Sequence, residues 1–195
     1  MTQTGTSGGP HPLIAGLLRG AAYPHAVSEP VRLVETHISW VLLTGDYAYK
    51  IKKPLRLSFL DYSTLERRRA LCEEELRLNS RHAPGLYVGV SAIAGPAEAP
   101  RVDGDGAPVE YAVRMRQFDA GQELGALLAA GLVTTDELAS LGEDIAALHG
   151  RAAQAPRGSR YGHPDTVRRV TLDNFAELRR LPEGNRVCIG IETLD

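Results

Sequence analysis

The pattern of the sequence changes near Phe118, and this change limits what the chain can fold into. Before Phe118, β-branched and aromatic residues gather in short segments separated by turn signals such as "TGD" and "DGDG", which is typical of antiparallel strands. We expect strands at residues 32–43, 47–51, 86–93 and 99–118, the first two joined as a hairpin and the last forming a hairpin around "DGDG". After Phe118, apolar residues recur at helical spacing. The order of elements predicts an α+β fold.

Five helices are expected, two in the first part of the chain and the others after Phe118. They are predicted at residues 13–22, 64–80, 121–131, 134–153 and 166–181. Residues 1–12 are rich in Gly, Ser, Thr and Pro, so we expect a disordered tail. The remaining chain then divides into a β-rich part at 13–118 and a helical part at 119–195.

Composition excludes several functional classes. The net charge of −2 and the pI near 6.3 argue against a dedicated nucleic-acid-binding protein, whose basic surface would dominate the charge. No apolar run is long enough to span a bilayer, and the N-terminus lacks the basic start and apolar core of a signal peptide. Cys72 and Cys188 are too few for a disulfide framework or a zinc site. We therefore expect a cytoplasmic protein that binds neither membrane nor nucleic acid.

The lysines are confined to one strand-like segment, although the chain has 22 lysine and arginine residues in total. They are Lys50, Lys52 and Lys53 in "YAYKIKKP". Because side chains alternate between the faces of a strand, Ala48 shares a face with Lys50 and Lys52. The opposite face carries Tyr47, Tyr49 and Ile51, which we expect to pack against the following helix or to cover the sheet. The basic face is then free for a ligand, and Lys53 is expected to be an edge charge.

The helix at 64–80 places one carboxylate on its apolar side. The motif "STLE" predicts that Ser63 caps this helix while Glu66 reaches back to it. At 100° per residue, Glu75 falls within the apolar arc, unlike the two glutamates before it. A half-buried carboxylate needs a partner. The candidates are Arg68 on the same helix and a lysine of the neighbouring strand.

These segments resemble the small lobe of the protein-kinase-like fold, an antiparallel sheet with one helix. More closely, the chain resembles the aminoglycoside phosphotransferase-related family that is often joined to a P-loop ATPase domain. The resemblance rests on "ETHISWVLLTGDYAYKIKKP" (35–54), "FLDYSTLERR" (59–68), "CEEELRLNSRHAPGLYVGV" (72–90) and "LASLGEDIAALH" (138–149). It implies a small lobe at 13–118 followed by an incomplete helical large lobe.

The resemblance also implies roles for individual residues. Ala48 would lie over an adenine, and Lys50 would reach the α- and β-phosphates while Glu75 holds it in place. Lys52, on the same face, is the rival phosphate contact. The remaining nucleotide-binding residues implied are the hydroxyls of Thr36 or Ser39 at a phosphate-covering turn, and backbone groups of a hinge from Met115 to Gln117.

The catalytic half of such an enzyme is not recognisable in the sequence. Kinase-like enzymes carry a His-x-Asp-x4-Asn loop and a later Asp for magnesium. In "HPDTVRRV", His163 and Asp165 fit, but Val170 stands where Asn is required, and Asp165 or Thr166 is instead expected to cap a helix. There is also no P-loop motif. No residue of the chain is therefore assigned a catalytic or metal-binding role.

Two functions remain as hypotheses. The first is an ATP- and Mg²⁺-dependent phosphotransferase acting on the hydroxyl group of a small molecule, catalytically incomplete in this chain. The second is a module that binds a nucleotide or a partner protein without catalysis. Binding of nucleic acid through the lysine cluster is the weakest interpretation, because Asp46 and Asp61 lie close to it in sequence.

Overall fold

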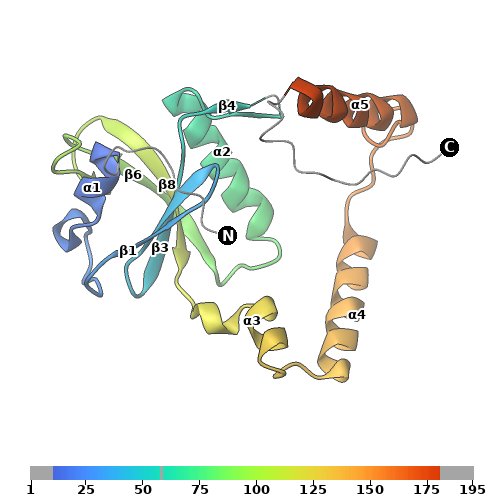
Figure 1. Cartoon of the computed structure of the whole chain (residues 1–195), viewed down its shortest axis with the longest axis horizontal. Coiled ribbons are helices and arrows are strands. Elements are labelled where there is room, and N and C mark those ends of the chain that lie inside the picture. The colour runs from blue at the N-terminus through green and yellow to red at the C-terminus, as the bar shows by residue number, and fades with distance from the viewer. Residues whose placement is uncertain (1–10, 58, 181–195) are drawn as a thin grey trace. The chain divides into compact units, whose positions relative to one another are not determined.

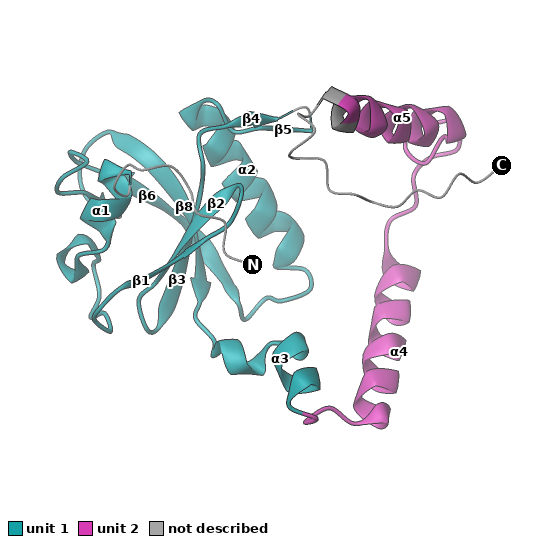
Figure 2. Cartoon of the chain, viewed as in Figure 1, with its two compact units in different colours: residues 1–130 teal, residues 131–195 magenta. Residues whose placement is uncertain are grey.

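The computed structural model describes residues 11–57 and 59–180, which fall into two compact units, Met1–Ala130 and Gly131–Asp195 (Figure 2). The division lies later in the chain than Phe118, so the first helices after the sheet belong to the first unit. Most of the expected tail at 1–12 lies outside the described residues, but Pro12 already opens the first helix.

The first unit is built on an antiparallel six-stranded sheet with the order β1-β2-β3-β8-β6-β7 (Figure 1). Its strands are β1 Arg32–Glu35, β2 Ser39–Leu43, β3 Tyr47–Lys52, β6 Tyr87–Ala94, β7 Arg101–Val102 and β8 Pro108–Arg116. A separate two-stranded ribbon, β4 Arg56–Leu57 with β5 Leu60–Asp61, was not predicted. The fold is mixed α+β with a curled antiparallel sheet, as the sequence order indicates.

The predicted hairpin around "DGDG" is wrong in its pairing. Strand β7 pairs with β6, and β8 pairs with β6 and β3, so β6 lies between the two expected partners. Asp103 leaves β7 with a positive φ of 52°, and the loop that follows carries the chain past β6 instead of folding it back. The physical reason lies in β8, whose Ala112 and Val113 are fully buried and need a strand on each side.

Seven helical segments occur in the described residues. They are α1 Pro12–Leu17, η1 Gly20–Ala22, α2 Leu65–Asn79, η2 Ala120–Gln122, α3 Leu124–Ala129, α4 Thr135–Arg151 and α5 Pro164–Arg180. The helix expected at 13–22 is thus two pieces, as is the one expected at 121–131. Helix α3 ends before Gly131, whose φ of +67° does not continue a helix.

Helix α2 begins one residue later than predicted. Thr64, not Ser63, is its N-cap, and the Thr64 hydroxyl accepts the backbone N–H of Arg67. Ser63 instead turns back to Asp61, to which its backbone N–H and its hydroxyl both donate. Adjacent hydroxyl residues compete for the cap position, and the Asp61 carboxylate decides this competition by binding Ser63.

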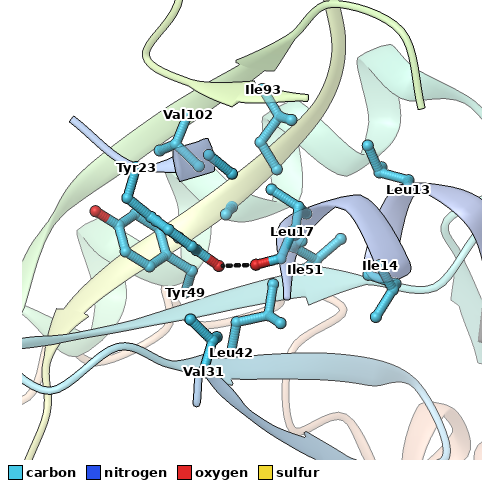
Figure 3. Packing of buried hydrophobic residues seen from close by; sticks show 12 residues of the cluster. Leu13, Ile14, Leu17, Tyr23, Val31, Leu42, Tyr49, Ile51, Ile93 and Val102 are labelled. Atoms are coloured by element: carbon cyan, nitrogen blue, oxygen red, sulfur yellow. Dashed lines mark hydrogen bonds between the residues drawn. The ribbon is translucent and has the colours of Figure 1, made fainter. Parts of the chain in front are cut away.

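The apolar core lies on the face of the sheet that carries α1 (Figure 3). Tyr49 and Ile51 of β3 contact the buried side of α1, where Leu17 is fully buried. The hydroxyl of Tyr23 donates to the carbonyl of Leu17 at 2.8 Å, which satisfies the end of this short helix. Each large apolar side chain buried here contributes about 1.5–3 kcal/mol. The expectation that the aromatic face of β3 packs against α2 is therefore wrong, because α1 occupies it.

Helix α2 covers the other face of the sheet and buries few apolar groups. Its buried residues are Arg68 and Cys72, and its Leu78 is exposed. Arg68 donates to both carboxylate oxygens of Glu110 in β8 at 2.8 and 2.9 Å. Polar contacts therefore contribute much of what fixes α2 to the sheet.

The second unit contains α4 and α5. A capping box opens α4: the Thr134 hydroxyl accepts the N–H of Glu137, and the Glu137 carboxylate accepts the N–H of Thr134. Helix α5 begins at Pro164, so neither Asp165 nor Thr166 is its cap. No helix within the described ranges combines the length and apolar character needed to cross a membrane.

Candidate functional site

Strand β3 presents Ala48, Lys50 and Lys52 on the face that α2 covers, as the alternation of side chains predicts. Ala48 is buried, and the two lysines differ sharply in exposure: the Lys50 side chain is 32% exposed and that of Lys52 only 4%. β3 is held in the middle of the sheet between β2 and β8. This face of β3 is therefore a rigid platform.

Helix α2 brings one carboxylate to both lysines. Oε1 of Glu75 lies 2.8 Å from Nζ of Lys50, and Oε2 lies 2.5 Å from Nζ of Lys52. Of the two predicted kinds of partner for Glu75, the lysines are confirmed, and Arg68 is taken by Glu110. Lys50 and Lys52 both contact the same group, so the carboxylate bridges two residues of one strand.

The electrostatics of this group favour full ionisation. Burial raises the pKa of Glu75, but hydrogen bonds and charges from Lys50 and Lys52 outweigh it and hold the pKa below its usual value. Burial likewise lowers the pKa of Lys52, but the hydrogen bond and charge of Glu75 prevail and raise it. The carboxylate and the buried ammonium are thus both charged near neutral pH.

Lys52 lies beside two uncharged groups in addition to its partner Glu75. Its Nζ lies 5.0 Å from the ring centre of Tyr62, a cation–π contact. Burial raises the pKa of the nearby Cys72 thiol to about 11, so this sulfur is neutral. Ser39 stands opposite Lys52 in the sheet and is 1% exposed. Lys50, in contrast, is open to solvent and can meet a ligand.

A cavity of about 280 Å³ lies beside Ala48 on the same face of the sheet. Its apolar wall is formed by Val34, Val41, Leu43, Ala48, Leu86 and Met115. This apolar lining and a volume near the lower end of small-ligand pockets suit a flat ring of nucleobase size. Sequence reasoning found Ala48 and Met115 but missed the others; the alternation along β1 and β2, which puts Val34 opposite Val41, could have indicated them.

The segment predicted as a hinge runs along this cavity, but most of its N–H groups are already used. Met115 pairs with Ala48 and Tyr87 within the sheet. The N–H of Arg116 donates to the Leu86 carbonyl at 2.8 Å. For Gln117, the N–H donates to the Asp46 carbonyl at 3.0 Å. The next N–H, that of Phe118, has no partner among the residues that the structure describes, and Phe118 lines the cavity.

The turn predicted to cover phosphate is closed on itself. The Thr36 hydroxyl accepts the N–H of Ser39 at 3.0 Å and donates to its carbonyl at 3.2 Å. Lys53 fastens the turn, because its ammonium lies 2.6 Å from both the Thr36 carbonyl and Oε1 of Glu35. Thr36 is exposed, whereas the Ser39 hydroxyl is buried and has no hydrogen-bond partner among the described residues. Contact of either hydroxyl with phosphate stays a prediction.

A second cavity, of about 550 Å³, adjoins the first and shares Arg32, Leu43, Gln117 and Phe118 with it. Charged and polar residues line it, including Glu29 and Asp119. No signal in the sequence indicated this cavity. Together, the two cavities extend from Ala48 to beyond the hinge residues Met115 to Gln117.

The described ranges contain no group of three or more His, Cys, Asp or Glu side chains that could hold a metal ion. The "HPD" motif lies in the second unit at the start of α5. There the His163 ring accepts the backbone N–H of Asp165 at 3.3 Å, and both side chains are exposed.

No protein-family model matches the chain. It is similar to three uncharacterized mycobacterial proteins, one from Mycobacterium bovis and two from strains of Mycobacterium tuberculosis. Each is 35% identical over 162 residues, which make up 82% of this chain and 31% of the relative. The chain therefore spans less than a third of the length of these relatives.

Among solved structures, the crystal structure of WbdD matches 54% of this chain and 22% of its own chain. The sequences are 17% identical and the TM-score is 0.27. A TM-score this low does not establish a shared fold.

Proposed function

We propose that this chain binds a purine nucleoside triphosphate and forms the nucleotide-binding part of a kinase-like phosphotransferase, of the kind related to aminoglycoside phosphotransferases. The observation that supports this most is the ion pair of Lys50 and Glu75. It lies on the face of β3 where Ala48, and Val41 opposite Lys50 in β2, line the apolar cavity. A half-exposed ammonium held by a carboxylate can donate to phosphate oxygens while keeping its position.

The spacing along β3 suits a nucleotide. Ala48 and Lys50 are two residues apart on one face, which separates them by roughly 6–7 Å. A base above Ala48 therefore leaves its phosphates near Lys50. The free N–H of Phe118 is the hinge donor that a base in the cavity can use. Lys52 is too buried to reach a ligand, so the phosphate contact is assigned to Lys50.

The chemistry attributed to this chain is binding and orientation. Phosphoryl transfer by this mechanism needs Mg²⁺ ligands and a group that accepts the proton of the attacking hydroxyl. No described residue is assigned to either role. The acceptor proposed is a hydroxyl group of a small molecule, on the strength of the family resemblance.

Calorimetric titration of the whole chain with ATP and with adenosine tests the proposal. Wild type is expected to bind both, and ATP more tightly. Lys50→Ala should weaken ATP binding by roughly 10- to 100-fold, the worth of a charge-assisted hydrogen bond, and leave adenosine binding unchanged. The matched control is Arg69→Ala, which removes one positive charge from the exposed side of α2.

Two results would overturn the proposal. One is the absence of ATP binding by the folded wild-type chain. The other is an ATP dissociation constant that is the same for Lys50→Ala and wild type. A fall in affinity of equal size in Arg69→Ala would show that overall charge, and not the site, is responsible.

A further inference from the structure

A lysine in a position of unusual burial completes the site. The Lys52 side chain is 4% exposed, and its ammonium is paired with Oε2 of Glu75. We propose that Lys52 is a positioning residue: it holds one oxygen of Glu75, so that the site keeps one uncompensated positive charge, on Lys50, for the phosphates of a nucleotide. This inference rests on the proposed function and explains how the site keeps a positive charge for phosphate.

The two oxygens of the Glu75 carboxylate have different lysine partners. Oε2 of Glu75 is 2.5 Å from the buried Nζ of Lys52, and Oε1 is 2.8 Å from the accessible Nζ of Lys50. If a phosphate draws Lys50 away, Glu75 keeps its other partner. A carboxylate with a single lysine partner would instead be left buried and unpaired, at considerable cost.

The local charges do not cancel. Two ammonium groups share one carboxylate, and the nearest titratable neighbours add nothing: the Cys72 thiol is neutral and the Tyr62 ring is uncharged. Arg68 and Glu110, the buried ion pair between α2 and β8, neutralise each other, and the exposed Glu74 of α2 is paired with Arg77. The balance is one positive charge in a half-buried place, and such a charge favours an anion.

The ligand class that fits is a di- or triphosphate, because the excess charge emerges on Lys50, next to the cavity that accepts the base. A neutral nucleoside makes no use of this charge. The ratio of ATP affinity to adenosine affinity therefore reports the contribution of Lys52, and adenosine binding serves as an internal check that the pocket is intact.

The first test measures this ratio for wild type, Lys52→Met and Lys52→Arg. Met has a similar length without charge, so the ratio should fall about 30-fold, as expected for one charge within roughly 8 Å at an effective dielectric constant near 20. Arg keeps the charge and should restore most of the ratio. A ratio unchanged in Lys52→Met overturns the inference, whereas failure of wild type to bind either ligand overturns the proposed function instead.

The second test measures the wild-type protein, and variants serve only to assign its signals. Because the chain has three lysines, selective ¹³C labelling of lysine gives three ε-methylene signals, assigned with single Lys→Arg variants. Addition of ADP should shift the Lys50 signal most and those of Lys52 and Lys53 much less. A shift at Lys52 equal to or larger than that at Lys50 would mean that Lys52 itself binds phosphate, which contradicts the positioning role.

Discussion

Arg68 of α2 and Glu110 of β8 form a buried ion pair in which the guanidinium Nε lies 2.8 and 2.9 Å from the two carboxylate oxygens. The side chains are only 9% and 6% exposed. Arg68 also donates through Nη1 to the Tyr62 carbonyl. The pair links α2, which carries Glu75, to β8, which leads to the hinge. It therefore helps to fix the position of Glu75 relative to the sheet.

Removing one partner of this pair is expected to destabilise the first unit strongly. Arg68→Met leaves the Glu110 carboxylate buried without its partner, which costs roughly 3–5 kcal/mol in the free energy of unfolding. Replacing both partners, as in Arg68→Met with Glu110→Leu, should recover part of this loss. Urea denaturation measures both variants. The exposed pair Arg69–Glu73 provides the control, and Arg69→Ala should have a much smaller effect; a similar loss in both would refute the role of burial.

A larger side chain at Ala48 is expected to block the cavity. Ala48→Leu extends the side chain into the space of about 280 Å³ and not into packed atoms, so the free energy of unfolding should change little. Adenosine affinity, measured by calorimetry, should fall at least about 10-fold because the base loses its apolar floor. Ala70→Leu makes the same change at an exposed position of α2. Undiminished adenosine binding by Ala48→Leu would place the base elsewhere.

The start of α2 gives a prediction that separates Ser63 from Thr64. Hydrogen bonds from the Ser63 hydroxyl and backbone, aided by Arg67, lower the pKa of Asp61 to about 2. Ser63→Ala should raise it toward the ordinary value of 3.8, as followed by NMR titration of the carboxyl carbon. Thr64→Ala should leave this pKa unchanged but destabilise the helix by about 1 kcal/mol, the usual worth of an N-cap. If Ser63→Ala destabilised the helix and Thr64→Ala raised the pKa of Asp61, Ser63 and not Thr64 would be the cap.

The parts of the fold that follow from local rules could be predicted from the sequence. Alternation along β3 separated the lysine face from the tyrosine face, and helical spacing placed Glu75 toward the sheet; the ion pairs confirm both. Each of these depends only on the repeat of a strand or a helix. The order of strands, by contrast, depends on long-range pairing, and so the position of β6 between β7 and β8 was missed.

The candidate site was predictable to a similar extent. Spacing pointed to Lys50 and Lys52 as rivals without deciding between them, since both share one face. Their exposure, 32% against 4%, depends on Tyr62 and α2, which pack from elsewhere in the chain. The cavities at the hinge depend in the same way on residues brought together from distant segments. Such contacts leave no local pattern in the sequence.

The pH dependence of stability should reveal the charge of Glu75. Its pKa is lowered in the folded chain by Lys50 and Lys52 against the effect of burial. A lowered pKa stabilises the fold above the unfolded value of about 4.5, and this contribution is lost as the pH falls through the lower folded pKa. The free energy of unfolding of wild type should therefore exceed that of Glu75→Gln by a constant amount above about pH 6, on the order of 2 kcal/mol.

That difference should shrink as the solution is acidified below about pH 4.5, because wild type then loses the ionised carboxylate that the Gln variant never had. Urea denaturation at a series of pH values measures it. Salt provides a further check: the half-buried group should be screened less than an exposed pair, so 0.5 M chloride should leave most of the difference intact at about pH 7. A difference that grows on acidification would show that burial, and not the two lysines, controls the Glu75 carboxylate.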